Sequence, residues 1–148
     1  MSQEFKNPPI LVVDDDRDDQ EMIEKAFKKI RVSRPVRSFF DGEELLDYLG
    51  RKGKYSDPLD SPRPCLILLD LNMPKMGGRE VLAMIKTDPS VRNIPVIILT
   101  TSKAQEDVLK SYDQGANSFI TKPENFEGLT KMATDLQRYW LETVELPG

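Results

Sequence analysis

Side chains that can do chemistry stand directly after short apolar runs of this sequence. They comprise three carboxylates, one hydroxyl and one ammonium group: Asp14, Asp15, Asp70, Thr100 and Lys122. Carboxylates that are brought close together repel one another, and a hard divalent cation with oxygen ligands, such as Mg²⁺, relieves that repulsion. If the fold gathers these side chains, they predict a metal-loaded acidic site beside a cation and a hydroxyl.

Such a site suits the transfer of a phosphoryl group. A metal and an ammonium group neutralise charge on the phosphoryl oxygens while a carboxylate oxygen attacks in line, and the product is an aspartyl phosphate. Asp70 is the best candidate for the nucleophile, because the glycines of the following segment, Met73–Gly78, allow the backbone to approach a phosphate closely. Asp15 is then expected to be a metal ligand.

The composition excludes several other chemistries. The 148 residues contain no histidine, so there can be no Ser-His-Asp or Cys-His pair, no histidine-ligated zinc and no phosphohistidine on this chain itself. The single cysteine, Cys65, opens an apolar run and excludes an intrachain disulfide, which favours a cytoplasmic protein with a buried thiol. Metals softer than Mg²⁺ are disfavoured because neither imidazole nor a thiolate pair is available.

Charge and hydropathy narrow the classes of partner. The formal net charge is −4, from 21 Lys and Arg against 25 Asp and Glu, so nucleic acid and anionic membranes are not expected partners. No stretch approaches the ~20 apolar residues of a membrane span, and residues 1–7 lack the apolar region of a signal peptide. Proteins or small ions are the expected partners.

Five short apolar runs predict the strands that position the candidate residues. The runs are Ile10–Val13, Val36–Phe40, Cys65–Leu69, Val96–Leu99 and Phe119–Ile120 with its flanks. Continuous apolar character is typical of strands that helices cover on both faces, and segments with helical periodicity separate the runs. The expected fold is α/β: one domain over residues 1–148, with a (βα)5, doubly wound, parallel five-stranded sheet of flavodoxin-like order. Ligands bind such sheets at the carboxyl ends of the strands.

Capping patterns predict where some of the helices begin and end. Asp41 with Glu44 forms one capping box, and Ser102 with a glutamine three residues later forms another. Gly115 is expected to terminate the helix that Ser102 opens, and the last helix runs nearly to the end of the chain. The turn-rich segment Gly50–Pro64 is expected to be a long exposed loop.

Each candidate residue, taken alone, also has a purely structural interpretation. The acidic stretch Asp14–Asp19 suits a helix N-terminus, where the helix dipole favours negative charge without any ligand. It also resembles half of a calcium loop, but Asp19 stands where the glycine of that loop belongs and Lys25 where its bidentate glutamate belongs. Thr100 alone suits a strand end, and Lys122 alone suits a solvated lysine before a turn. Only their joint placement favours a site.

Four segments together resemble one protein family. The segment ILVVDD begins at Ile10, LLDLNMPKMGG at Leu68, IILTTS at Ile97 and GANSFITKP at Gly115. In this combination, which spans almost the whole chain, the sequence is similar to the CheY-like receiver domain of two-component response regulators. The resemblance implies a signalling phosphoacceptor that assists its own phosphotransfer and dephosphorylation, with no independent turnover of a substrate.

The resemblance also implies a role for each matching residue of the acidic site. Asp70 is the phosphoacceptor, and Lys122 pairs with its phosphoryl group. Asp14 and Asp15 hold Mg²⁺, for which Mn²⁺ can substitute. Asp70 and the main-chain carbonyl of Asn72 complete the ligands of the cation.

Further positions of the resemblance concern switching and the lifetime of the phosphoryl group. Thr100 hydrogen-bonds the phosphoryl group, and Phe119 stands at the position of the aromatic residue that turns inward in response. The peptide bond before Pro123 is implied to be cis, which orients the neighbouring lysine. The residues that tune the lifetime are Asn72, Thr101 and Ser102. Thr101 is larger than the Ala or Gly of many members.

Resemblance to one subtype of response regulator implies particular protein partners. The Gly50–Pro64 loop and the tail RYWLETVELP after Gln137 look like those of stand-alone response regulators that act with bacterial and cyanobacterial phytochromes. A light-sensing phytochrome histidine kinase is the implied donor, the downstream protein is unknown, and no output domain is expected. Trp140 of the tail either packs on its own domain or anchors a homodimer through the last helix.

Three rival functions have weaker support in the residues. A haloacid-dehalogenase-like phosphohydrolase uses a similar set, here Asp14, Asp16, Thr100 and Lys122. It would also need an acidic pair after a later strand, and it leaves Asp70 without a role. A flavodoxin-type FMN binder needs a first loop that cradles a phosphate, whereas three successive aspartates repel one. A non-phosphorylated interaction module has no need of an intact acidic site with its lysine.

Overall fold

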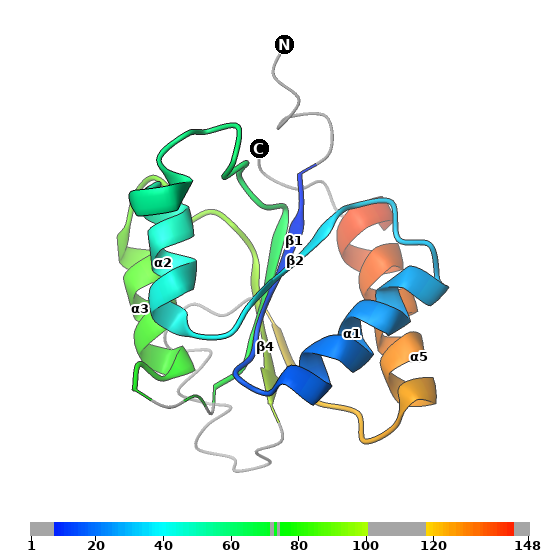
Figure 1. The fold of residues 1–148 in the computed structure, drawn as a ribbon. Helices are drawn as coiled ribbons and strands as arrows, with labels where there is room; N and C mark the ends of the chain where they lie inside the picture. The colour runs from blue at the N-terminus through cyan, green and yellow to red at the C-terminus, as the bar shows by residue number, and fades with distance from the viewer. Residues whose placement is uncertain (1–7, 72, 74, 101–117, 144–148) are drawn as a thin grey trace.

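Five short parallel strands form one sheet in the computed structural model, which describes residues 8–71, 73, 75–100 and 118–143 (Figure 1). The strands are β1 (Ile10–Val13), β2 (Val36–Phe39), β3 (Leu66–Leu69), β4 (Val96–Thr100) and β5 (Ser118–Thr121). Their order in the sheet is β2-β1-β3-β4-β5. This order confirms the predicted flavodoxin-like, doubly wound architecture. Because the order reverses at β1, ligands are expected at the carboxyl ends of β1 and β3.

Helices cover both faces of the sheet. They are α1 (Arg17–Lys29), α2 (Gly42–Gly50), α3 (Gly78–Thr87) and α5 (Phe126–Leu136), and α5 continues into a π-helical segment, Gln137–Thr143. Figure 1 shows α1 beside α5 on one face and α2 beside α3 on the other. The helix predicted between Ser102 and Gly115 lies outside the described residues.

Both faces of the two central strands are buried, which explains their continuous apolar character. Every residue of β1 and β3 is at most 1% exposed. Alternate residues face opposite layers: Leu11 and Val13 belong to the core beneath α2 and α3, whereas Ile10 and Val12 pack in the core beneath α1 and α5. A strand enclosed in this way must be apolar throughout, so the first polar residue after it stands at the edge of the sheet.

The first turn of α1 is fixed to the ends of two strands. Asp16 is the N-cap residue, and its carboxylate accepts hydrogen bonds from the backbone N–H groups of Asp18 and Asp19 at 2.9 and 3.2 Å. Gln20 is buried, and its Nε2 donates to three backbone carbonyls. They belong to Val12, Asp14 and Phe39, at 3.0, 3.3 and 2.9 Å. The side chain of Gln20 therefore ties α1 to β1, to β2 and to the acidic loop that joins β1 to α1.

The predicted cap of α2 is present, but the loop that follows this helix is more ordered than its turn residues suggest. Asp41 accepts a hydrogen bond from the N–H of Glu44 at 2.7 Å. In the Gly50–Pro64 segment, Ser61 is fully buried and its hydroxyl donates to loop carbonyls. Tyr48 of α2 donates its hydroxyl to a carbonyl of the same loop, and burial raises the pKa of Tyr48 to about 12. The prediction of an exposed loop was therefore wrong for the part that packs on α2.

Gly78, the first residue of α3, packs against the backbone that follows β3. A Cβ atom at this position would lie 2.2 Å from the backbone carbonyl oxygen of Asp70. A side chain here must displace Asp70, so we expect Gly78→Ala to lower the free energy of unfolding by about 1–3 kcal/mol. Urea denaturation measures this loss.

Gly77→Ala is the matched control for this substitution. A Cβ atom at Gly77 meets only the carbonyl oxygen of Leu71, at 3.8 Å, which is an ordinary contact. Because Gly77 is the N-cap residue of α3, we expect a loss below about 1 kcal/mol. Equal losses in the two variants would contradict the steric conflict with Asp70.

Candidate functional site

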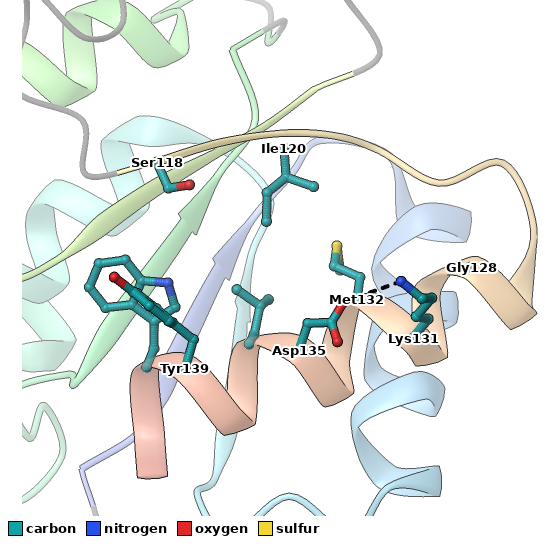
Figure 2. Close-up of a pocket in the computed structure, with 9 residues that line it drawn as sticks. Ser118, Ile120, Gly128, Lys131, Met132, Asp135 and Tyr139 are labelled. Carbon is teal, nitrogen blue, oxygen red and sulfur yellow. Dashed lines mark ion pairs between the residues drawn. The ribbon is translucent and has the colours of Figure 1, made fainter. Parts of the chain in front are cut away.

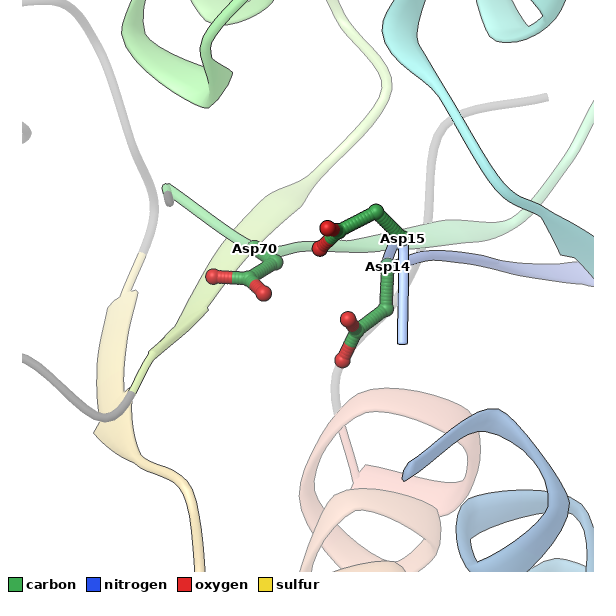
Figure 3. A group of neighbouring side chains, drawn as sticks. All are labelled: Asp14, Asp15 and Asp70. Carbon is green, nitrogen blue, oxygen red and sulfur yellow. The ribbon is translucent and has the colours of Figure 1, made fainter. Parts of the chain in front are cut away.

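Three aspartates meet where β1 and β3 end. Val13 and Leu69 are partners in the register of these strands, so the residues that follow them, Asp14 and Asp70, emerge side by side. One carboxylate oxygen from each of Asp14, Asp15 and Asp70 lies within 4.8 Å of the others, and Figure 3 shows the three side chains gathered at the strand ends. Asp14 and Asp70 are buried, whereas Asp15 is exposed.

Lys122, which follows β5, reaches this cluster. Its Nζ lies 2.6 Å from Asp14 Oδ2, 2.8 Å from Asp19 Oδ2 and 3.5 Å from Asp70 Oδ2. Burial lowers the pKa of Lys122, but hydrogen bonds to Asp14 and Asp19 and the nearby negative charges outweigh burial and hold that pKa above its usual range. The ammonium is therefore charged at neutral pH and neutralises part of the cluster.

Asp14 depends most on this ammonium. Its side chain is only 2% exposed, and its Oδ2 accepts the hydrogen bond from Lys122. Its other carboxylate oxygen accepts from the backbone N–H of Asp16 at 3.0 Å. Such partners are required, because a buried charge without compensation is costly.

Asp19 contacts the site although the sequence interpretation gave it no role there. The two interpretations of the stretch Asp14–Asp19 hold for different members: Asp16 caps α1, whereas Asp14 and Asp15 join the acidic cluster. The helix cap at Asp16 is also the sequence signal from which the position of Asp19 beside the site could have been predicted. A helix that begins at Arg17 turns back over the end of β1, which brings its first-turn carboxylate to the lysine.

The donor set of the cluster fits a hard divalent cation. Three carboxylates offer only oxygen atoms, and the exposed Asp15 gives solvent access to the cluster. The chain has no histidine, and burial raises the pKa of its single thiol, Cys65, to about 11. These features match a preference for Mg²⁺ or Mn²⁺ over thiophilic metals.

Two predicted switch residues lie on neighbouring strands. Thr100 ends β4, where its backbone pairs with Thr121 of β5. Phe119 of β5 is partly buried and packs against the core beneath α2 and α3. The predicted tuning residues and the side chain of Thr100 lie outside the described part of the chain. The predicted tuning residues are Asn72, whose main-chain carbonyl is also a predicted metal ligand, Thr101 and Ser102.

The cis peptide bond predicted before Pro123 is absent. No peptide bond among the described residues is cis, so Lys122 and Pro123 are joined by a trans bond. The trans isomer is favoured by about 0.5–1 kcal/mol before proline. With this bond trans, the Nζ of Lys122 still lies 2.6 Å from Asp14 Oδ2 and 3.5 Å from Asp70 Oδ2.

Comparison with known families decides between the candidate folds and functions. The family model described as the response regulator receiver domain matches residues 10–134, which is most of the chain. The chain belongs to the response regulator receiver family. The match contains all five strands and the acidic cluster, so the predicted resemblance is confirmed, and a phosphohydrolase or a non-phosphorylated module is not favoured for this receiver.

Relatives of this receiver include phytochrome response regulators. Response regulator Rcp1 of Synechocystis sp. is 43% identical over an alignment of 149 positions, which covers 99% of this chain and 99% of that one. A crystal structure of the Mn²⁺-bound form of Rcp1 superimposes with a TM-score of 0.85 at 41% identity, over 95% of this chain and 99% of that one. The phosphorylated cyanobacterial phytochrome response regulator RcpA gives a TM-score of 0.88 at 40% identity, over 96% and 99%. The receiver is thus homologous to phytochrome response regulators.

A groove of about 530 Å³ runs between β5 and α5 of the receiver (Figure 2). Ile120, Met132 and Leu136 contribute apolar side chains to it, and Tyr139 lies at its edge with 56% exposure. Trp140 is partly buried against the core beneath α1 and α5, which confirms the interpretation that it packs on its own domain. A homodimer through this helix stays a prediction. Among the described helices none is both long and apolar enough to cross a bilayer.

Proposed function

We propose that this receiver accepts a phosphoryl group on Asp70 from a phytochrome histidine kinase. The observation that supports this function best is the meeting of three aspartates with one charged lysine at the carboxyl ends of β1, β3 and β5. Homology to phytochrome response regulators, one of which was crystallised in a phosphorylated form, supports both the reaction and the partner.

In the proposed reaction, a carboxylate oxygen of Asp70 attacks the phosphorus of a phosphohistidine on the kinase. The P–O bond forms as the P–N bond breaks, and the electron pair of that bond returns to the imidazole ring of the kinase. The acyl phosphate carries more negative charge than the carboxylate did. Lys122, whose Nζ is 3.5 Å from Asp70 Oδ2, pairs with the phosphoryl oxygens and offsets this charge.

Asp14, Asp15 and Asp70 hold Mg²⁺ in this proposal, with the carbonyl of Asn72 as a further ligand and Mn²⁺ as a substitute. The oxygen donor set and the Mn²⁺-bound form of Rcp1 support a divalent cation here. When bound, the cation neutralises charge on the phosphoryl oxygens. The aspartates fix its position, and Asp70 thereby serves as both ligand and nucleophile.

Thr100 and Phe119 transmit the response. The hydroxyl of Thr100 hydrogen-bonds the phosphoryl group, and Phe119, which is only partly buried, turns inward and buries more of its ring. Phosphorylation thereby shifts a pre-existing equilibrium toward the active state. Asn72, Thr101 and Ser102 tune the lifetime of that state. The receiver turns over no separate substrate, and it acts in the cytoplasm on an unknown downstream protein.

Phosphotransfer profiling tests the proposed partner. Each histidine kinase encoded in the same genome is autophosphorylated and mixed with the receiver, and the rate of transfer is measured. We expect the phytochrome kinase to give the fastest transfer, and a phytochrome kinase whose phosphoacceptor histidine is replaced by glutamine to give none. Faster transfer from another kinase would contradict the phytochrome partner alone. Failure with every kinase would contradict the phosphoacceptor function.

A further inference from the structure

The ammonium of Lys122 is shared unequally among three carboxylates. It lies closer to Asp14 and Asp19, at 2.6 and 2.8 Å, than to Asp70, at 3.5 Å. Asp14 and Asp70 belong to the acidic cluster, whereas Asp19 does not. Among the described partners of the ammonium, Asp19 is thus the one that lies outside the candidate metal ligands.

Local structure fixes Asp19 in this place. Its backbone N–H is bound by the capping carboxylate of Asp16, which sets the first turn of α1. The next residue, Gln20, is buried and donates to the backbone carbonyl of Asp14, so the turn is anchored to the acidic loop. The carboxylate of Asp19 therefore faces Lys122 from a supported position, although 39% of its side chain is exposed.

We propose that Asp19 is a positioning residue that takes up part of the charge of the Lys122 ammonium and holds it away from Asp70, so that the ammonium competes less with a divalent cation. This proposal rests on the proposed function, because it concerns how the same site admits a divalent cation. An ammonium and a divalent cation compete for the oxygens of Asp14 and Asp70, since both are neutralised by the same carboxylates. By binding the ammonium on the helix side, Asp19 leaves more of this negative charge for the cation.

Loss of the Asp19 carboxylate should weaken cation binding. In the Asp19→Asn variant, Lys122 keeps Asp14 and Asp70 as its charged partners among the residues that the structure describes, so its ammonium competes more strongly for them. Since Asp19 is partly exposed and its ion pair is screened by solvent, we expect the Mg²⁺ dissociation constant to rise about two- to fivefold.

Asp18→Asn is the matched control, because it removes the same charge from the same helical turn. The side chain of Asp18 is exposed, and only its backbone N–H contacts the cap. Isothermal titration calorimetry with MgCl₂ at constant ionic strength measures both variants and the wild type. We expect the Asp19 variant to bind Mg²⁺ more weakly than the Asp18 variant, which should stay near the wild type.

A second pair of variants tests whether Asp19 acts through the lysine. In a Lys122→Met background, Asp19→Asn and Asp18→Asn should change the Mg²⁺ dissociation constant equally, because there is no ammonium left to position. Equal effects of the two substitutions in the wild-type background would overturn the role of Asp19 and leave the proposed function intact. If the wild type itself does not bind Mg²⁺ at millimolar concentration, the metal site of the proposed function fails, and the role of Asp19 fails with it.

Discussion

Replacement of Lys122 by methionine should lower the free energy of unfolding of the metal-free receiver by about 3–5 kcal/mol. The substitution keeps most of the length of the side chain but removes the ammonium, which lies 2.6 Å from Asp14 Oδ2. Asp14 is 2% exposed on its side chain and would be left as a buried charge between two other carboxylates. This loss of stability arises more from the buried, uncompensated charge of Asp14 than from the loss of the ion pair itself.

Lys131→Met is the control for removing a lysine. The Lys131 side chain is 82% exposed and forms a surface pair with Asp135 at 3.7 Å, so we expect a loss below about 0.5 kcal/mol. Urea denaturation with a chelator present gives both values. Adding Mg²⁺ should recover part of the stability of the Lys122 variant, because the cation neutralises the same carboxylates.

The stability that the Lys122 ammonium contributes to the folded receiver depends on pH with a defined sign. The pKa of Lys122 in the folded receiver lies above its usual range, so the stabilisation by its charge is fully present below about pH 10 and is lost only as the pH rises through the folded value. A loss below about 1 kcal/mol, or one that Mg²⁺ does not reduce, would contradict the role assigned to the ammonium.

The fold could be predicted because its central strands are enclosed on both faces. Burial on two sides requires every residue of β1 and β3 to be apolar, and such runs are visible without any structure. The same enclosure explains why the polar residue after each run marks the edge of the sheet. Asp14 and Asp70 were therefore identifiable as neighbours, since parallel strands in register end together.

Contacts made by side chains across the fold were not predictable from local patterns. Asp19 looks like any acidic residue of a first helical turn until Lys122, more than a hundred residues away, is brought beside it. Gln20 looks like a polar surface residue, yet its amide is buried on backbone carbonyls. In the Gly50–Pro64 segment, turn residues correctly indicated a loop, but they did not reveal that Ser61, which is part of this loop, would be buried.

Replacement of Asp70 by asparagine should abolish phosphorylation of the receiver. An amide lacks the anionic oxygen that attacks phosphorus, and no histidine is present to accept the group instead. The variant should fold, because it removes one of three mutually repelling carboxylates. Asp18→Asn, which changes an exposed carboxylate outside the cluster, is the control and should be phosphorylated like the wild type.

The most direct measurement maps the phosphorylated residue. The wild type and both variants are incubated with acetyl phosphate and Mg²⁺, and the acyl phosphate is trapped by borohydride reduction before peptide mass spectrometry. We predict one modified residue, Asp70, in the wild type and in the Asp18 variant, and no modification in the Asp70 variant. Modification of a different residue in the wild type, or persistent phosphorylation after Asp70→Asn, would contradict the assignment of Asp70 as the phosphoacceptor.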